Sequence, residues 1–484
     1  MSVDVERLRA SIDKQWRESI RELLHEYVRI PSLSPAFDSQ WQAHGHIDAA
    51  ARLLARWCRA RPIRDIHVEV HELAGLTPLL WVEVPGEASG CILIYGHLDK
   101  QPEMTGWAPG LGPWEPVERE GRLYGRGSAD DGYSVFSALS ALVALREQGV
   151  ALPRCLVMIE ASEESGSIHL QAHLEALGHR LGTPSLVICL DAQCGNYDQL
   201  WSTTSLRGCI EGVLRVRVLS APVHSGLAGG IAPTPLRVAT QLLARVEDPA
   251  SGQLLLPQLS AAMPSDAGEQ IALAARILGP AIMTKAPLLQ NVRCVVDDRA
   301  HLLANNYWRG ALTVTGVDGL PATASAGSVI APDIALRVSC RLPPSVDAAD
   351  AAQAVRSAFE SDPPYAVHVS FEIDDALSGW AAPPSARWLC DSLQRASLQI
   401  FGAEAIQFGC GGTIPFLPML ARRFPHAQFF VTGVLGPESS AHGPNEFLDV
   451  DYARKLTCCL ALAIADCADA PVPARDSRPE FPQA

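Results

Sequence analysis

The segment Cys91–Asp99, CILIYGHLD, constrains the fold more than any other part of the sequence. Its apolar run is typical of a strand buried on both faces, as found inside a parallel sheet. The strand ends at Gly96, and His97 and Asp99 follow it, two residues apart. Ligands bind at the carboxyl ends of strands in α/β sheets, so His97 is a candidate metal ligand that Asp99 can orient. An isolated His-x-Asp is more often a hydrogen-bonded histidine, so the later segments must decide between the two interpretations.

Two adjacent carboxylates, Asp130 and Asp131, lie in the glycine-rich turn LYGRGSADDG, just ahead of an apolar helix that begins near Tyr133. An aspartate in this place often caps a helix N-terminus. Capping needs only one carboxylate, so the second one requires another explanation.

Further acidic residues follow the next buried strands. Glu163 and Glu164 come after the strand at about 155–159, and Asp191 ends the strand at about 186–190. Two adjacent glutamates at a protein surface simply repel each other. At a strand end the two glutamates can have different roles, so that one binds a metal ion and the other activates water.

The order of strands and helices predicts two domains. Their alternation over 92–191 predicts a doubly wound α/β domain with a mostly parallel sheet, formed by 1–207 and 383–484. Residues 208–382 read as βαββαβ, the ferredoxin-like pattern, and form a domain inserted into the first. A stretch at about 248–308, rich in leucine and alanine, interrupts that pattern and is expected to be helical. Residues after Ala470 are proline-rich and are expected to be disordered.

Composition excludes several classes of partner. The net charge of −14 argues against binding to nucleic acid or to an anionic membrane. No stretch reaches the roughly 18 apolar residues of a membrane span, and the N-terminus lacks the pattern of a signal peptide. The 13 cysteines include no CxxC pair, so we expect reduced thiols and a cytoplasmic protein.

Five residues at strand ends or in tight loops of one predicted sheet form a candidate metal centre: His97, Asp130, Glu164, Asp191 and His442. Histidine nitrogen and carboxylate oxygen suit zinc, and also manganese or cobalt. Five ligands exceed the need of one tetrahedral ion. With one bridging carboxylate they satisfy two ions roughly 3.5–4 Å apart, as in two-metal hydrolases, and Glu163 could then act as general base toward water.

The motifs GHLD, LYGRGSADDG, EASEESGS, the strand ending in Asp191, HSGLAGG and SAHGPNE occur in this order. Together they resemble the di-zinc exopeptidase and deacylase family, which includes carnosine dipeptidase, cytosolic nonspecific dipeptidase, aminoacylase, acetylornithine deacetylase and succinyl-diaminopimelate desuccinylase. The resemblance covers about Ile30 to Leu456. The segments WEPVEREGRLYGRG and GGTIP are similar to the dipeptidase branch.

The resemblance implies a role for each metal ligand. His97 would bind one ion, and Asp130 would bridge two divalent ions, most simply zinc. Glu164 and Asp191 would each hold one ion, and His442 would complete the pair. The peptide bond after Asp130 is cis in relatives.

The resemblance also implies the other site residues. Asp99 would orient His97, and Glu163 would be the catalytic base. The inserted domain would act as a lid and dimerisation domain, and its His224 would reach the active site of the partner in a homodimer. Arg341 would hold the carboxylate of the substrate, and Thr413 of GGTIP would also contact the substrate.

The sequence departs from the family pattern in two places. Gly132 and Tyr133 replace a Lys-Gly pair, and Cys410 replaces a glutamate that can receive the free amine of the substrate. We expect an enzyme that hydrolyses an amide bond next to a free carboxylate, most simply in dipeptides. A deacylase of N-acyl or N-carbamoyl amino acids is an alternative, and an inactive metal-bound binding protein is another.

Overall fold

The structure of the chain is a computed structural model that describes residues 3–286 and 288–469. The predicted disorder after Ala470 lies outside the described residues. All 13 cysteines fall within them, and each is a free thiol. No helix in this range is both long and apolar enough to cross a bilayer.

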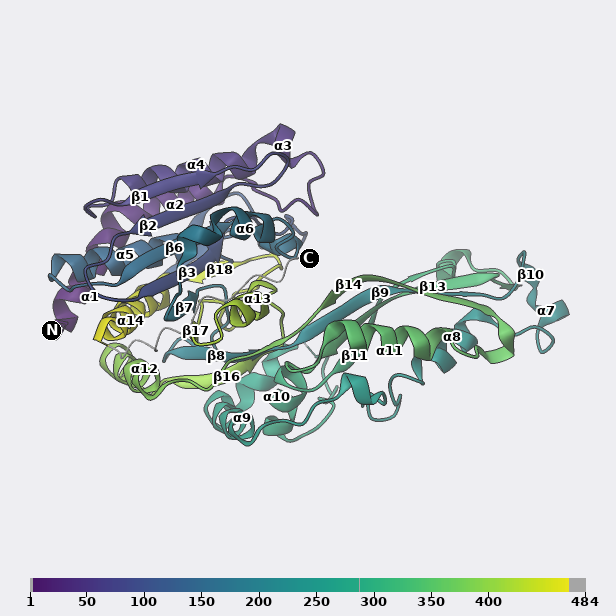
Figure 1. Cartoon of the computed structure of the whole chain (residues 1–484). Coiled ribbons are helices and arrows are strands. Elements are labelled where there is room, and N and C mark those ends of the chain that lie inside the picture. Colours follow the sequence, from purple (N-terminus) through teal and green to yellow (C-terminus); the bar gives the residue numbers. More distant parts are fainter. Residues whose placement is uncertain (1–2, 287, 470–484) are drawn as a thin grey trace. The chain divides into compact units, whose positions relative to one another are not determined.

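The chain forms two compact units. The first comprises Met1–Thr203, Ala382–Gln407 and Leu420–Ala484, and the second comprises Thr204–Ala381 and Phe408–Met419. In Figure 1 the first unit is drawn mainly in purple, blue and yellow, and the second mainly in teal and green.

The first unit is built on a mixed sheet whose strands lie in the order β1-β2-β6-β3-β7-β17-β8. These strands are β1 (His67–His71), β2 (Leu79–Val84), β3 (Cys91–His97), β6 (Arg154–Glu160), β7 (Leu186–Cys189), β8 (Trp201–Leu206) and β17 (Gln428–Val431). Neighbouring strands from β6 through β3 and β7 to β17 are parallel. The pairs at the flanks are antiparallel, so the parallel part is smaller than the predicted mostly parallel sheet.

Helices of the first unit pack on this sheet and on one another. They are α1 (Val5–Gln15), α2 (Arg21–Val28), α3 (Trp41–His44), α4 (His46–Arg59), α5 (Ser134–Glu147), α6 (Leu170–Leu181), α12 (Arg387–Ile400) and α14 (Val450–Asp469). The helix α13 (Phe416–Arg423) and the strands β8 and β16 (Ile406–Cys410) carry the chain across the boundary between the units. The α/β class is confirmed.

A small sheet beside the main one carries loops of the candidate site. Its strands are β4 (Val117–Arg119), β5 (Arg122–Tyr124) and β18 (Phe447–Asp449), in the order β18-β5-β4. Residue Phe447 pairs with Tyr124, which brings the segment before α14 beside the glycine-rich turn that precedes Asp130.

Buried polar contacts hold the segment after β3 in place. The Tyr27 hydroxyl donates to the Leu98 carbonyl at 2.9 Å. The fully buried Lys100 ammonium donates to the carbonyls of Tyr27 and Ile30, at 2.7 and 2.8 Å. The Tyr27 carbonyl lies in the last turn of α2 and the Ile30 carbonyl in the loop after it, so the lysine links the end of the helix to the loop.

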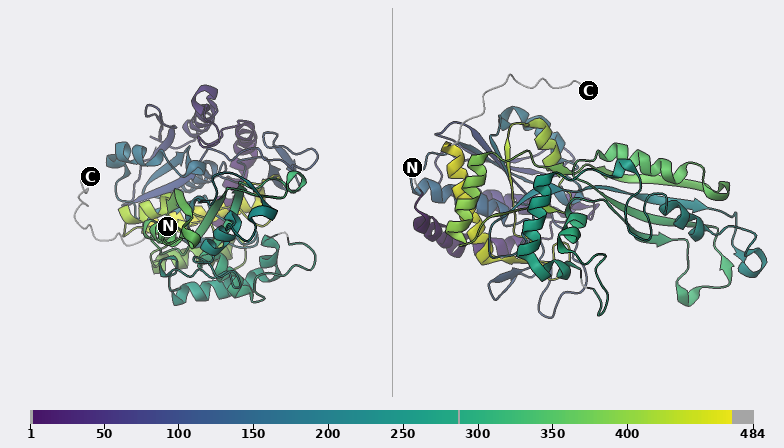
Figure 2. Two further views of the ribbon diagram at one scale, coloured as in Figure 1. Left: turned by 90° about the vertical axis from the view of Figure 1, so that its right-hand side faces the viewer. Right: turned by 90° about the horizontal axis from the view of Figure 1, so that it is seen from below.

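The second unit contains a four-stranded antiparallel sheet in the order β11-β13-β9-β14. In chain order these strands and two helices are β9, α8, β11, β13, α11 and β14, which is the ferredoxin-like βαββαβ pattern that the sequence predicts. Helices α8 and α11 pack against this sheet, and Figure 2 shows the green α11 lying along it. The elements of this unit are β9 (Gly208–Arg217), β10 (Val223–His224), α7 (Ser225–Ala228), α8 (Pro235–Leu243), α9 (Ser265–Leu278), α10 (Arg299–Tyr307), β11 (Ala311–Asp318), β12 (Val329–Ile330), β13 (Asp333–Leu342), α11 (Ala348–Glu360), β14 (His368–Leu377) and β15 (Trp380–Ala381).

The stretch at 248–308 carries α9 and α10, as its composition predicts. The domain boundaries need one correction, because Phe408–Met419 group with the second unit and not with the first. The reason is a set of contacts with Arg207, whose guanidinium Nε donates to Gly411 O at 3.3 Å and whose carbonyl accepts from Thr413 Oγ1 at 2.5 Å.

Candidate metal centre and active site

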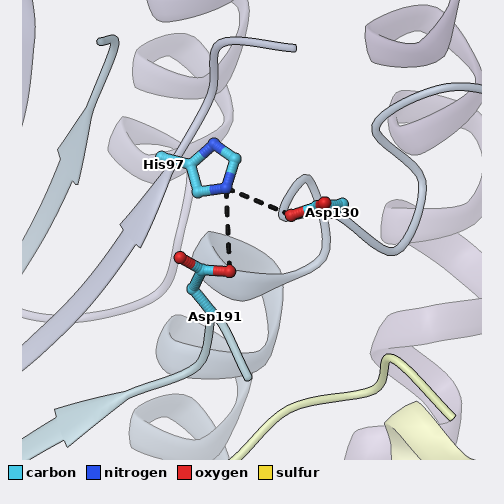
Figure 3. A group of neighbouring side chains, drawn as sticks. All are labelled: His97, Asp130 and Asp191. Atoms are coloured by element: carbon cyan, nitrogen blue, oxygen red, sulfur yellow. Dashed lines mark hydrogen bonds and ion pairs between the residues drawn. The ribbon is translucent and has the colours of Figure 1, made fainter. Parts of the chain in front are cut away.

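The end of β3 presents His97 to two carboxylates. The Nε2 atom of His97 lies 3.3 Å from Asp130 Oδ1 and 3.8 Å from Asp191 Oδ1 (Figure 3). These three side chains come from the ends of β3 and β7 and from the turn before α5, and all three are buried. Parallel neighbours β3 and β7 end at the same edge of the sheet, which explains why His97 and Asp191 meet.

A second group forms on the other side of Asp130. The Nε2 atom of His442 lies 3.0 Å from Asp130 Oδ2 and 3.2 Å from Glu164 Oε2. Asp130 therefore directs one carboxylate oxygen to His97 and the other to His442. The two groups, which share Asp130, are the ones among the described residues that could hold a metal ion.

The electrostatics of both groups favour added positive charge. Burial raises the pKa of Asp191 well above its usual value, and the charge of Glu163 raises it further. Burial also raises the pKa of Glu164, with Asp130 contributing. Acids that are costly to ionise in this space are stabilised by nearby cations.

When protonated, the two histidines supply part of this positive charge. Burial opposes protonation of His97, but its hydrogen bond to Asp130 and the charge of Asp191 raise its pKa well above the usual value. The His442 side chain is 55% exposed, and although partial loss of hydration lowers its pKa, hydrogen bonds to Asp130 and Glu164 outweigh this effect and raise the pKa to about 11. Burial raises the pKa of Asp130 too, yet its bonds to His442 and His97 prevail, so that the net shift is downward.

One buried carboxylate oxygen of the second group lacks a hydrogen-bond partner among the described residues. Glu164 Oε1 is buried and has no hydrogen-bond partner within residues 3–286 and 288–469, although Oε2 accepts a hydrogen bond from Gln101 Nε2 at 2.7 Å. An unsatisfied buried carboxylate oxygen is costly. The orphaned oxygen and the mixed nitrogen and oxygen donors both fit a divalent cation.

Asp99 contacts more than the histidine that the sequence analysis assigns to it. Its main-chain oxygen lies 3.1 Å from His97 Nδ1, while its carboxylate Oδ1 lies 3.6 Å from the same atom. The two carboxylate oxygens accept hydrogen bonds from the backbone N–H groups of Glu163 and Glu164, at 3.1 and 3.0 Å. Asp99 therefore also orients the turn that carries the predicted base and one predicted ligand.

Glu163 begins a short 3₁₀ turn, Glu163–Ser165, and stands outside both ligand groups. Burial raises its pKa well above the usual value, and the charge of Glu164 adds to this effect. Glu163 is thus a carboxylate outside the two ligand groups, and its role as the base stays a prediction.

The structure contains site features that the sequence analysis did not assign. Asp131 is fully buried, and its Oδ2 accepts a hydrogen bond from the His97 backbone N–H at 3.1 Å. Gln101 holds Glu164 as described above. Asp131 follows the assigned Asp130, and Gln101 is two residues after the assigned Asp99. No sequence pattern distinguishes either residue as part of the site. The peptide bond between Asp130 and Asp131 is cis, as the family resemblance implies.

Three predicted substrate-binding residues lie in the second unit. Arg341, on β13, donates from Nη1 to Thr413 Oγ1 at 3.3 Å, so the structure brings these two together. His224 is exposed at the end of β10, beside the short helix α7.

The comparison with known proteins decides the family. Residues 93–466 match the model of Peptidase family M20/M25/M40. The chain belongs to this family. It is therefore a metallopeptidase, a hydrolase that uses divalent metal ions, and the predicted recognition and enzyme class are confirmed.

Relatives carry the names of dipeptidases, in agreement with the predicted branch. The chain is 27% identical over 377 residues to a cysteinylglycine-S-conjugate dipeptidase of Corynebacterium striatum, which covers 77% of this chain and 80% of the relative. It is 24% identical over 482 residues to the Cys-Gly metallodipeptidase dug1 of Schizosaccharomyces pombe, covering 94% and 96% of the two chains.

Solved structures show the same fold. The dipeptidase Dug1p of Saccharomyces cerevisiae superposes with a TM-score of 0.77 at 20% identity, covering 98% of this chain and all of that one. Human carnosine dipeptidase 1 superposes with a TM-score of 0.75 at 21% identity, covering 96% of this chain and all of that one.

The position of Asp130 generates a prediction about metal affinity. Calorimetric titration of chelator-treated protein with zinc or manganese should show two ions per chain. Asp130→Ala should weaken both binding events, because Asp130 contacts both ligand groups, whereas Asp191→Ala should weaken one. Asp451→Ala, at an exposed aspartate of α14, is the matched control and should bind as the wild type does. Loss of only one ion in Asp130→Ala would contradict the shared role.

Proposed function

We propose that this chain is a dipeptidase that hydrolyses the peptide bond next to a free C-terminal carboxylate, using two divalent ions. The observation that carries the proposal is the orientation of Asp130, whose two oxygens face two separate ligand groups. The family and the relatives named as dipeptidases support the choice of substrate.

Zinc is the ion that we propose for both positions, because two histidines and three carboxylates supply the nitrogen and oxygen donors that it favours. Manganese and cobalt accept the same donors. Ions held by these residues would lower the pKa of water and polarise a carbonyl oxygen.

Glu163 is the proposed general base. It takes a proton from the attacking water and returns that proton to the leaving amine when the peptide bond breaks. The hydrogen bond from its backbone N–H to Asp99 fixes the start of its turn, so the carboxylate is presented from a defined backbone. Its neighbour Glu164 remains a ligand.

Arg341 and Thr413 are the proposed contacts of the substrate carboxylate. Thr413 Oγ1 donates its hydrogen to Arg207 O and accepts from Arg341, so it holds the guanidinium in one orientation. A guanidinium can bind a carboxylate through two parallel hydrogen bonds.

A second candidate function rests on Cys410. The thiol is buried, and its sulfur lies 3.4 Å from the Gly412 backbone nitrogen. An uncharged residue at this place removes a partner for a free substrate amine. This favours a deacylase that acts on N-acyl or N-carbamoyl amino acids with the same catalytic residues.

We further propose that the second unit is a lid and dimerisation domain, and that the enzyme is a cytoplasmic homodimer. His224 lies near exposed apolar side chains, with Leu227 74%, Ile231 83% and Val329 54% exposed. Burial of such side chains against a second copy is favourable, and a two-fold interface repeats each contact. The 13 free thiols support a reducing compartment.

The base and the ligand can be separated by substitution. Glu163→Gln should lower kcat by roughly 10²–10⁴-fold, the loss typical of a missing general base, while both ions stay bound. Steady-state kinetics and elemental analysis measure the two effects. Glu175→Gln, an exposed glutamate of α6, is the control and should be unchanged. Departure of an ion from Glu163→Gln would show that Glu163 is a ligand instead.

The role of Arg341 can be tested with matched substrates. Arg341→Ala should lower kcat/KM for a dipeptide by a factor that corresponds to about 2–3 kcal/mol of binding free energy, the value of a lost charge-assisted contact. The loss for the C-terminal amide of the same dipeptide should be much smaller. Arg337→Ala, on the same strand but exposed and paired with Asp374, should affect neither substrate. Equal losses on acid and amide would remove Arg341 from the site. Faster turnover of N-acetylated substrates than of free dipeptides would favour the deacylase.

The proposed dimer predicts shared active sites. Mixing inactive His224→Ala and Glu163→Gln proteins should restore part of the activity, because one site of each mixed dimer has both residues intact. Subunit exchange is followed by native mass spectrometry. An absence of recovery in proven mixed dimers would place His224 in its own subunit's site or outside any site.

A further inference from the structure

The loop that presents His442 has little regular structure to hold it. It joins β17 to β18, and several of its non-glycine residues adopt positive φ, among them Glu438, Ser440, His442 and Asn445. Its backbone therefore makes no strand ladder or helix through which His442 could be positioned. A few backbone hydrogen bonds close its turns, such as that from Phe447 N–H to Ser439 O at 3.1 Å, and contacts with side chains from elsewhere add to them.

One buried arginine ties this loop to the other ligand segments. Arg126 is 1% exposed, and all three of its guanidinium nitrogens donate. Nη2 donates to Gly443 O at 2.7 Å, next to His442, and Nε donates to Pro102 O at 3.1 Å, in the segment after β3. Nη1 donates to Glu446 Oε2 at 2.7 Å.

Glu446 continues this connection to the shared ligand. Its carboxylate is fully buried, and Oε1 accepts from the backbone N–H groups of Ala129 and Asp130, both at 3.2 Å. Its main-chain oxygen accepts from Gly125 N at 3.0 Å, which extends the pairing of β5 with β18. The Arg126–Glu446 pair thus joins the segment of His442 to the backbone of Asp130.

We propose that Arg126 and Glu446 are positioning residues that set the separation of Asp130 and His442, and thereby the affinity for divalent ions. This inference rests on the proposed two-ion site. Neither residue belongs to the ligand groups, so the pair acts on the ions only through the residues that it holds.

The chemistry of the pair supports positioning over simple stabilisation. A buried ion pair is often no more stabilising than apolar side chains of similar volume, so stability alone does not explain its presence here. The planar guanidinium serves three acceptors in fixed directions, which a lysine ammonium does not reproduce. Residues that orient metal ligands typically change metal affinity by roughly 10–100-fold when they are replaced.

The test compares metal affinity with stability. In the double variant Arg126→Met with Glu446→Leu, no buried charge is left unpaired, so the protein should still fold. Its Tm should lie below that of the wild type, because the N–H groups of Ala129 and Asp130 and the carbonyls of Gly443 and Pro102 lose a partner. Competition with a chromophoric chelator should show zinc binding weakened by roughly 10–100-fold, and kcat should recover at saturating zinc. The matched control is Arg154→Met with Glu83→Leu, which removes the 2.7 Å ion pair between β6 and β2 and should leave zinc affinity unchanged.

A second variant decides the question if the double variant does not fold. Arg126→Lys keeps the charge next to Glu446 but loses the fork that reaches Gly443 and Pro102, so zinc affinity should again fall with little loss of Tm. Wild-type zinc affinity in a folded double variant, or in Arg126→Lys, would overturn the inference. A wild-type chain that binds no divalent ion at all would instead overturn the proposed function.

Discussion

The site is built around a cluster of carboxylates that repel one another unless nearby positive charge offsets their negative charge. Asp130, Glu164 and Asp191 converge on two histidines, and Glu163 lies beside them. His97, Asp130 and Asp191 are buried, whereas the His442 side chain is exposed. Charges repel more strongly in a medium of low dielectric constant than in water. Two cations on either side of Asp130 would convert this repulsion into attraction, so the same residues that are costly in isolation become a strong binding site.

The fold brings these groups together by simple means. The parallel strands β3 and β7 end at one edge of the sheet and deliver His97 and Asp191, while the turn after β6 delivers Glu164. Further contacts hold some of the ligands, as Gln101 does for Glu164 and the main-chain oxygen of Asp99 does for His97. Rigid strands thus supply the approximate positions, and buried hydrogen bonds supply the precise ones.

The sequence predicted the parts of the site that follow local rules. The apolar runs before His97 and Asp191 predict buried strands, and parallel strands that end at one edge of a sheet predict that these two side chains lie close together, as the structure has them. His442 lies in an irregular loop, and only the motif around it pointed to the site. The contacts of Asp99 with the backbone of the following turn, and the grouping of Phe408–Met419 with the second unit, arise from tertiary contacts that no local pattern encodes.

The central claim is that Asp130 is shared by two ions, and diffraction tests it most directly. Crystals grown with manganese or zinc should show two anomalous-scattering peaks, one next to each oxygen of Asp130, with His97 and Asp191 beside one peak and His442 and Glu164 beside the other. One peak at full occupancy, in crystals saturated with the metal and retaining activity when dissolved, would contradict the account.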